Sequence, residues 1–178
     1  IVAGSGIDID GGNIDGGNTL LDGCLYKFDA DGTPLARWSK TFDNFTPRTV
    51  TVDEQGNVYI ADSGSNKIRK ISVDTGIIET DVGTGKAGFS GDGGLGLNAQ
   101  LDRPRGIDFD SLGNLYVGDL GNNRVRKVDS RSHHIETFAG NGKTDRHQRV
   151  PDDEGDGVLA HQAQLPKPES VSLDQTNG

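Results

Sequence analysis

The amino-acid sequence predicts an all-β fold assembled from repeated four-stranded units. A stretch that begins at Pro104 (PRGIDFDSLGNLYVGDLGNNRVRKVD) repeats one that begins at Pro47 (PRTVTVDEQGNVYIADSGSNKIRKIS). A third copy begins at Pro168 and reads PESVSLDQTNG. Within each copy, short runs of alternating apolar and polar residues are separated by glycine, aspartate and asparagine. This pattern is typical of half-buried strands joined by tight turns.

The second copy contains four such strands in order. Their apolar pairs are Ile107 and Phe109, Leu115 and Val117, Val125 and Val128, and Ile135 and Phe138. The pattern predicts antiparallel units over residues 48–82 and 105–139, an incomplete unit before residue 40 and a lone inner strand near 169–174. The three copies start 57 and 64 residues apart. Repeats of about this length with four strands each are typical of β-propeller blades.

The last copy lacks its second half, and residues 1–6 (IVAGSG) match that missing half. We therefore expect one propeller segment of about three blades, whose first and last blades are incomplete. Its parts are blade fragments in 1–46, blades in 47–103 and 104–167, and the start of a further blade in 168–178. Soluble proteins rarely leave strand edges unpaired. We expect another copy of the chain, or the rest of a longer chain, to complete the split blade.

The composition narrows the class of protein. The chain has 178 residues, a net charge of −9, 31% hydrophobic residues and 27 glycines. Such values are common in disordered proteins, but the strand periodicity favours a folded repeat protein, in which each strand buries only a narrow stripe. Cys24 is the single cysteine, which excludes an intrachain disulfide. No apolar run is long enough for a membrane span, so we expect no membrane insertion.

The repeat resembles the NHL repeat. The second copy has the pattern's residues at nine positions: Pro104, Gly106, Asp110, Gly113, Asn114, Tyr116, Asp119, Asn123 and Arg124. The other copies depart from it mildly, at Thr49, Lys67 and Ser170. The resemblance implies an NHL-type β-propeller, an architecture that hosts many binding roles. The linker AGFSGDGGLGLNAQLDRP also resembles spacers of secreted NHL proteins, from which we expect an extracellular or cell-surface location.

Parts of this linker recur 64 residues later. Gly91-Asp92-Gly93 returns as Gly155-Asp156-Gly157, and Ala99-Gln100-Leu101 returns as Ala163-Gln164-Leu165. The recurrence favours a structural crossing between blades in which Leu101 and Leu165 fill the core. Glycines there would supply positive φ angles and aspartates would bond exposed backbone N–H groups.

All the long connections are expected on one face of the propeller. They are residues 6–23, 83–103 and 140–167, whereas the turns on the other face are short (DEQG, VDTG, DSLG, DADG). Extra length on one face usually marks the binding face of a repeat protein. We expect a protein or glycan partner there, at Asp92, Arg146, Arg149, Asp152, Asp153, Glu154 and Asp156. Solvated spacers without a function are the alternative.

The excess of acidic residues in these connections would repel a phosphate backbone, so we expect no nucleic-acid partner.

A glycine-rich acidic stretch, DIDGGNIDGGN, is a candidate calcium loop. Calcium takes six to eight oxygen ligands, and Asp8, Asp10, Asn13 and Asp15 could supply several of them. The spacing differs from the EF-hand loop, and an acidic solvated turn explains the same residues. A separate acceptor pattern for N-glycosylation is present at Asn44-Phe45-Thr46.

Catalysis is less well supported than binding. The alternative is a fragment of a propeller enzyme, of lyase or lactonase type, with a metal at the central channel. His133 and His134 are expected at the start of an outer strand, and His147 and His161 in loops. The predicted inner strands instead carry Thr49, Thr51, Ile107 and Phe109. Asp62 and Asp119 recur in both copies, which favours a structural hydrogen-bond bracket. We therefore expect a non-catalytic interaction or assembly module without an enzymatic cofactor.

Overall fold

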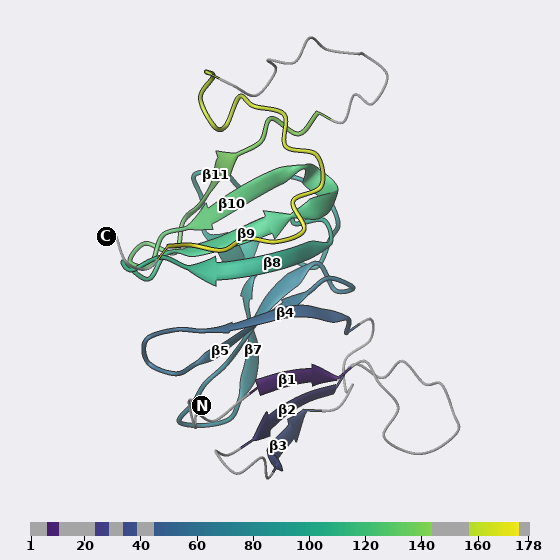
Figure 1. Ribbon diagram of the computed structural model, residues 1–178, viewed down its shortest axis with the longest axis vertical. Coiled ribbons are helices and arrows are strands. Elements are labelled where there is room, and N and C mark those ends of the chain that lie inside the picture. The colour runs from purple at the N-terminus through teal and green to yellow at the C-terminus, as the bar shows by residue number, and fades with distance from the viewer. Residues whose placement is uncertain (1–6, 11–23, 29–33, 39–44, 144–156, 175–178) are drawn as a thin grey trace, which may run out of the picture.

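The computed structural model describes residues 7–10, 24–28, 34–38, 45–143 and 157–174. Their strands, all before residue 140, form antiparallel β-sheets (Figure 1). A three-stranded sheet contains β1 (Ile7–Asp10), β2 (Cys24–Phe28) and β3 (Pro34–Trp38). Two four-stranded sheets follow, each in sequential strand order. Consecutive antiparallel strands in sheets stacked side by side confirm the predicted partial propeller.

The two complete sheets match the predicted units. The earlier of the two complete sheets, called the first blade from here on, comprises β4 (Pro47–Val52), β5 (Val58–Asp62), β6 (Lys67–Ile71) and β7 (Ile78–Val82). The second blade comprises β8 (Pro104–Phe109), β9 (Leu115–Asp119), β10 (Arg124–Val128) and β11 (Ile135–Ala139). Two short 3-10 turns, η1 (Gly96–Asn98) and η2 (Leu120–Asn122), complete the assigned elements of the described residues.

The first turn of each blade is built the same way. Asp53 accepts hydrogen bonds from the backbone and side-chain nitrogens of Asn57, both at 2.8 Å, and Asp110 accepts the same pair from Asn114, also at 2.8 Å. Gly113 in the second turn has a φ of 78°, which strongly favours glycine. The repeated Asp-x-x-Gly-Asn sequence is therefore explained by turn geometry.

The hydrophobic core lies mainly between the two blades. Its fully buried members include Ile68 and Val82 of the first blade and Val117 and Ile135 of the second. Leu101 from the linker lies in the same cluster with no exposed surface, which confirms its predicted core position. A second cluster (Phe45, Val58, Ile60 and Ile71) covers the opposite side of the first blade. The first blade thus buries both of its faces.

The linker between the blades is hydrogen-bonded along its length. Gly83 and Thr84 donate to the carbonyls of Gly96 and Ala99. The second linker repeats these bonds: Gly140 and Asn141 donate to the carbonyls of Ala160 and Ala163, with the donors 57 and the acceptors 64 residues later. The linker also pairs with the start of β11, since Gly93 donates to Ile135 and Ile135 donates to Gly94. The linker therefore covers part of the outer edge of the second blade.

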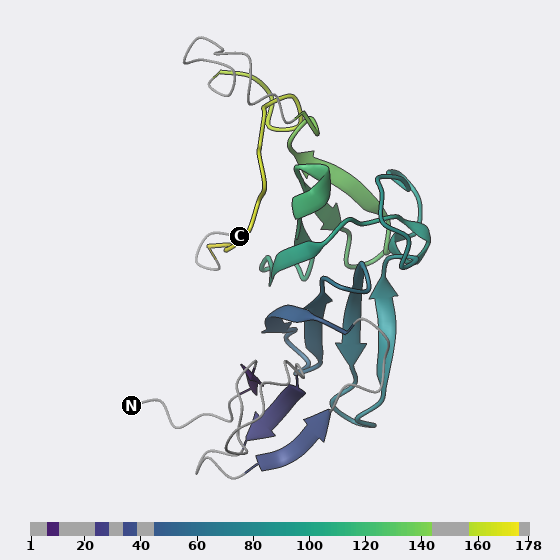
Figure 2. The same cartoon turned by 90° about the vertical axis from the view of Figure 1, so that its right-hand side faces the viewer.

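Residues 168–174 lie where the next inner strand was predicted, but they are extended without assigned strand pairing. They run beside the second blade (Figures 1 and 2), and the Leu173 nitrogen donates to Asp108 Oδ2 at 2.8 Å. A Cβ on Gly106 would lie 2.6 Å from the Ser170 Cα, which explains why glycine stands there. The segment has the extended course expected of a lone inner strand, and no neighbouring strand within the described residues exchanges ladder bonds with it.

The N-terminal sheet also differs from the prediction. β1 lies within the stretch that was expected to be a long loop, 6–23, and pairs with β2 through Asp8 opposite Tyr26 and Asp10 opposite Cys24. The strand expected at residues 1–5 lies outside the described residues. Within the described part of the chain, no helix is long and apolar enough to cross a membrane.

Candidate functional site

The repeat predicts a hydrogen-bond bracket, meaning side chains that tie the chain entering a blade to that blade. Two buried aspartates form it. Asp62, at the end of β5, accepts a hydrogen bond from the Thr46 nitrogen at 2.9 Å, and Asp119, at the end of β9, accepts one from the Asp102 nitrogen at 2.8 Å. Both donors lie just before the inner strand of the same blade. Each aspartate thus attaches the entering chain to its blade, which is a structural role.

Two asparagines complete the bracket on the same side. Asn66 Oδ1 accepts from the Arg103 nitrogen at 2.9 Å, and Asn123 Oδ1 accepts from the Lys167 nitrogen at 3.1 Å. Both asparagines have a φ of 53°, a left-handed conformation that asparagine tolerates better than most residues. Each joins the top of one blade to the start of the next repeat.

Arg126 makes the most deeply buried ion pairs of the described residues. Its side chain has no exposed surface, and it lies 2.6 Å from Asp92 and 3.4 Å from Asp119. Thr137 also donates to Asp92, at 2.7 Å. Asp92 was expected to contact a partner, but its carboxylate bonds to the second blade. Burial raises the pKa of Asp119 to about 6, although Asn122, the Asp102 nitrogen and Arg126 each oppose the rise.

The long-loop face carries a shallow pocket of about 440 Å³. At its side, the Arg124 guanidinium lies 3.8 Å from the centre of the Phe89 ring. Arg124 also donates to the carbonyls of Asn122 at 3.0 Å and Asn141 at 2.9 Å. His161 from the second linker lines the same pocket. The pocket therefore joins an aromatic ring, a fixed cation and a histidine.

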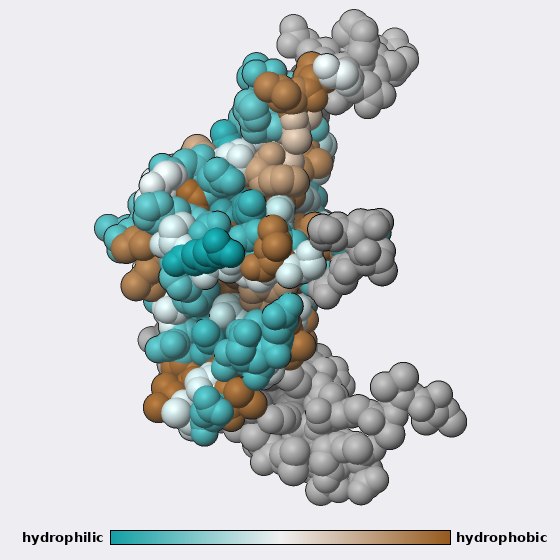
Figure 3. Space-filling view, turned by 90° about the vertical axis from the view of Figure 1, so that its left-hand side faces the viewer, coloured by the Kyte–Doolittle hydropathy of each residue, from teal (hydrophilic) through white to brown (hydrophobic). Residues whose placement is uncertain are grey.

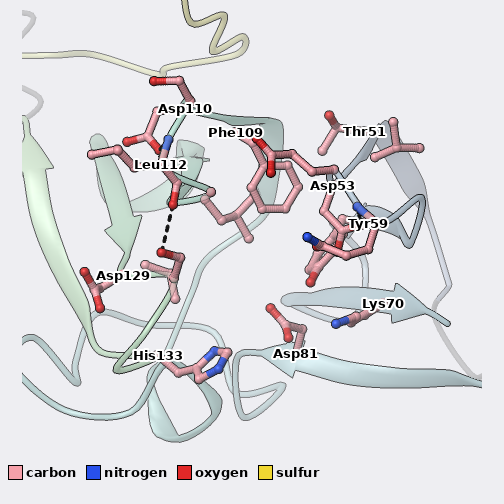
Figure 4. Close-up of a pocket in the computed structure, with 18 residues that line it drawn as sticks. Thr51, Asp53, Tyr59, Lys70, Asp81, Phe109, Asp110, Leu112, Asp129 and His133 are labelled. Carbon is pink, nitrogen blue, oxygen red and sulfur yellow. Dashed lines mark hydrogen bonds between the residues drawn. The ribbon is translucent and has the colours of Figure 1, made fainter. Parts of the chain in front are cut away.

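A larger pocket, of about 670 Å³, opens between the two blades on the short-turn face. Figure 4 shows Tyr59, Lys70 and Asp81 from the first blade facing Phe109 and His133 from the second. The rings of Tyr59 and Phe109 meet edge to face, with centroids 4.8 Å apart. The Lys70 amine lies 5.3 Å from the Tyr59 ring centre. Aromatic walls and charged groups thus share this pocket.

The charged groups of this pocket influence one another. Burial raises the pKa of Asp81, while the positive charges of Lys70 and His133 oppose that rise. Burial would lower the pKa of Lys70, but its hydrogen bond to Tyr59 and the nearby acidic groups raise it overall. Burial likewise raises the pKa of Tyr59 against the effect of Lys70. The pocket therefore keeps an ammonium group next to a partly desolvated carboxylate.

The predicted calcium ligands are only partly placed. Asp8 and Asp10 lie in β1, so the loop assumed for them is wrong at these two positions. Asn13 and Asp15 lie outside the described residues. Among the described residues, no group of three or more histidine, cysteine, aspartate or glutamate side chains is arranged to hold a metal ion.

Most of the predicted partner-binding residues lie outside the described part of the chain, as does Asn44. These residues are Arg146, Arg149, Asp152, Asp153, Glu154 and Asp156. Of the predicted set, Asp92 alone falls within the described residues, and it lines the loop-face pocket while bonding Arg126.

Sequence reasoning missed the larger pocket. Tyr59 and Lys70 recur in the second copy as Tyr116 and Lys127, so they carry no special signal. The informative residues depart from the repeat: Asp81 stands where the second copy has Phe138, and His133 stands where the first has Gly76. A comparison of the copies position by position could have selected these two.

Comparison with known proteins agrees with the repeat pattern. Residues 101–128 match the NHL repeat profile. NHL repeat-containing protein 2 of Homo sapiens is 28% identical over 153 residues, which cover 76% of this chain and 20% of the relative. Teneurin-1 of Mus musculus is 29% identical over 100 residues, which cover 49% of this chain and 4% of that protein. The chain thus spans a fifth or less of the length of these relatives.

A solved structure supports the fold. An auxiliary nutrient binding protein from Bacteroides ovatus aligns with a TM-score of 0.60 and 18% identity, over 83% of this chain and 37% of the other. At this identity the likeness concerns the fold alone. From the repeated motif, the two four-stranded blades and the matched profile, we conclude that the chain contains an NHL repeat and folds as part of a β-propeller.

Proposed function

We propose that this propeller segment is a non-catalytic interaction module that binds a protein or glycan through its long-loop face. The observation that carries the proposal is the stacked Phe89 and Arg124 pair beside the loop-face pocket. Phe89 is 41% exposed although it is a large hydrophobic side chain. Exposed aromatic residues next to arginine are frequent at the energetic centres of binding sites.

The pair is held in place before any partner arrives. Two carbonyl groups accept hydrogen bonds from Arg124, and the Phe89 ring lies against its guanidinium. Arg126 approaches the same ring, with its guanidinium carbon 4.8 Å from the ring centre. A partner therefore meets an ordered surface, which lowers the entropy lost on binding. The ring suits a sugar face or an apolar side chain.

The enzyme alternative has less support. A lyase or lactonase with a central metal needs ligands that converge on the axis, and no observation in the described residues favours such a set. We therefore retain binding as the proposed function. Completion of the split blade, by another copy or by further chain, is part of the same proposal.

Binding can be tested by selection and mutation. A glycan array and a phage-displayed peptide library would be screened with the 178-residue chain. Deletion of residues 144–153 is expected to weaken the selected ligand about tenfold or more while thermal stability stays nearly unchanged. Ile77→Ser, in a short turn on the opposite face, serves as the control, because Ile77 is 62% exposed and lies outside the larger pocket. Selected ligands that respond to Ile77→Ser and not to the deletion would contradict the proposal.

Calcium binding and an extracellular location are further proposals drawn from the sequence. A calcium ion held only by the folded state would raise the melting temperature, and a chelator would reverse that rise. An unchanged melting temperature with calcium and with chelator would count against the site.

An extracellular location would expose Asn44 to N-glycosylation. Secretion of the chain from a eukaryotic host followed by deglycosylation would then show a mass change at Asn44. An unmodified secreted chain would argue against use of this acceptor.

A further inference from the structure

The larger pocket lies on the face opposite the proposed loop-face site. The short turns of both blades surround it, and their tips carry exposed hydrophobic side chains: Val52 is 52% exposed and Leu112 is 74% exposed. The view of this face in Figure 3 shows hydrophobic side chains scattered among mostly hydrophilic ones. Exposed apolar residues around a hollow are a frequent feature of protein-binding surfaces.

Two residues that break the repeat face each other in this pocket. Asp81 replaces the apolar residue of the second copy, and His133 replaces the glycine of the first. His133 has a φ of 56°, and Gly76 has a φ of 67° at the corresponding position. Histidine in this left-handed conformation costs free energy that glycine would not. Turn geometry therefore does not explain the histidine, whereas its side chain lines the pocket (Figure 4).

The acidic groups of the pocket divide into two kinds. Asp53, Asp110 and Asp129 accept hydrogen bonds from their own turns, so their oxygens are largely engaged. The Asp81 carboxylate accepts no hydrogen bond from a side chain or backbone group of the described residues. It belongs to β7 and faces the open volume together with Lys70 and His133 (Figure 4). Glu54 also lines the pocket, from the turn after β4. The Asp81 carboxylate, which faces residues of the second blade, is thus a group available to a ligand, and the other acidic groups make the surrounding potential negative.

We propose that this pocket binds a lysine or arginine side chain of a partner protein segment that carries apolar residues on either side. The cationic group would be placed near Asp81, and the edges of Tyr59 and Phe109 would pack against its aliphatic stem. The His133 ring would contact it from the second blade. Val52 and Leu112 would contact the flanking apolar residues. The site is separate from the loop-face function and does not rest on it.

A pocket of this size suits a side chain with its neighbours. About 670 Å³ lies within the range of ligand pockets, and it exceeds what a bare ion requires. Among the described residues, no group of three or more histidine, cysteine, aspartate or glutamate side chains is arranged to hold a metal ion, so nothing in this pocket favours a metal over a side chain. The net charge of −9 would also speed the approach of a basic segment.

The test uses the peptides Ac-ALRLA-NH2 and Ac-ALQLA-NH2 as probes, followed by NMR of the whole chain. The arginine peptide is expected to shift the amide signals of Leu112, Gly113 and His133, and the glutamine peptide to bind about tenfold more weakly. Asp81→Asn should weaken the arginine peptide about tenfold. Asp74→Asn removes the same charge from an exposed position on this face, outside the pocket, and should change the affinity less than twofold.

Several results would overturn the assignment. Equal affinity for both peptides, or equal losses for the two aspartate variants, would show that no specific cation site exists. Peptide shifts confined to Asn141 and His161 would place binding on the other face. Calcium shifting the same signals at lower concentration than the peptide would indicate a metal site instead. If Asp81→Asn failed to fold, Leu112→Ser would replace it, since Leu112 is largely exposed and its loss should weaken binding several-fold.

Discussion

The two blades use the same arginine and threonine in different ways. In the first blade, Arg69 donates directly to Thr80 at 2.7 Å and lies 3.5 Å from Asp62. In the second, Asp92 stands between the equivalent pair, and both Arg126 and Thr137 bond to it. The linker that supplies Asp92 also buries Arg126 completely, whereas 12% of the Arg69 side chain is exposed. Identical residues at equivalent repeat positions therefore form different polar networks, because the linker packed against them differs.

The faces of the blades differ for a similar reason. Ile68 and Val82 of the first blade have no exposed surface, because the second blade packs over them. The equivalent Val125 and Ala139 are only half-buried. The tyrosines show the same contrast: Tyr59 meets Phe109 of the neighbouring blade, while Tyr116 meets Phe138 of its own sheet at 5.0 Å. Burial in a propeller thus depends on the neighbouring blade as much as on the repeat itself.

Substitution of each arginine gives the largest expected effect and tests the difference between the polar networks of the two blades. Arg126→Met should destabilise the fold by about 4 kcal/mol, because it leaves Asp119 in a buried site without its cation. Arg69→Met should cost about 2 kcal/mol, since that arginine is closer to solvent. Urea unfolding of both variants gives the two values. Equal losses would refute the difference that we assign to the linker.

The apolar comparison can be tested with two leucines of the repeated linker. Leu101 is fully buried between the blades, and Leu165 at the same repeat position is partly exposed. Leu101→Ala should cost about 3 kcal/mol through the cavity that it leaves, and Leu165→Ala less than about 1 kcal/mol. Denaturant midpoints at constant m-value would measure both. A large loss for Leu165→Ala would show that a further blade already covers it in solution.

The buried Asp119 predicts a pH effect. Its pKa is raised from 3.8 to about 6, so the folded state binds a proton more tightly than the unfolded state. This group alone therefore makes the fold less stable as the pH rises from about 4 to 6, by at most about 3 kcal/mol. Unfolding free energies measured across this range should show a contribution of that sign, and Asp119→Asn should remove it. Identical profiles for the two proteins would contradict the raised pKa.

The smallest expected effect concerns the left-handed position in the last turn of each blade. His133→Gly should raise stability by up to about 1 kcal/mol, and Gly76→Ala should lower it by about 1 kcal/mol. No atom lies within 4 Å of a Cβ built on Gly76, so backbone strain alone would account for its loss. Thermal unfolding followed by circular dichroism would detect both shifts. A destabilised His133→Gly would mean that the histidine supports the fold.

The sequence by itself determined the repeated units, their strand order and their tight turns. Alternating apolar residues and Asp-x-x-Gly-Asn turns are patterns of only a few residues, so they can be recognised in the sequence without knowledge of tertiary contacts. The structural role of Asp62 and Asp119 was also predictable, because a bracket recurs with the blade. Leu101 was assigned to the core from the repeated linker alone.

Only the tertiary structure decided which repeated residues meet across blades. Asp81 and His133 lie 52 positions apart and share a pocket because the second blade packs on the first. Asp92 bonds Arg126 because the linker folds across β11, which no local pattern reveals. Long-range contacts of this kind depend on how one sheet packs against the next. The sequence encodes that packing through shape and burial over the whole molecule, and no short motif displays it.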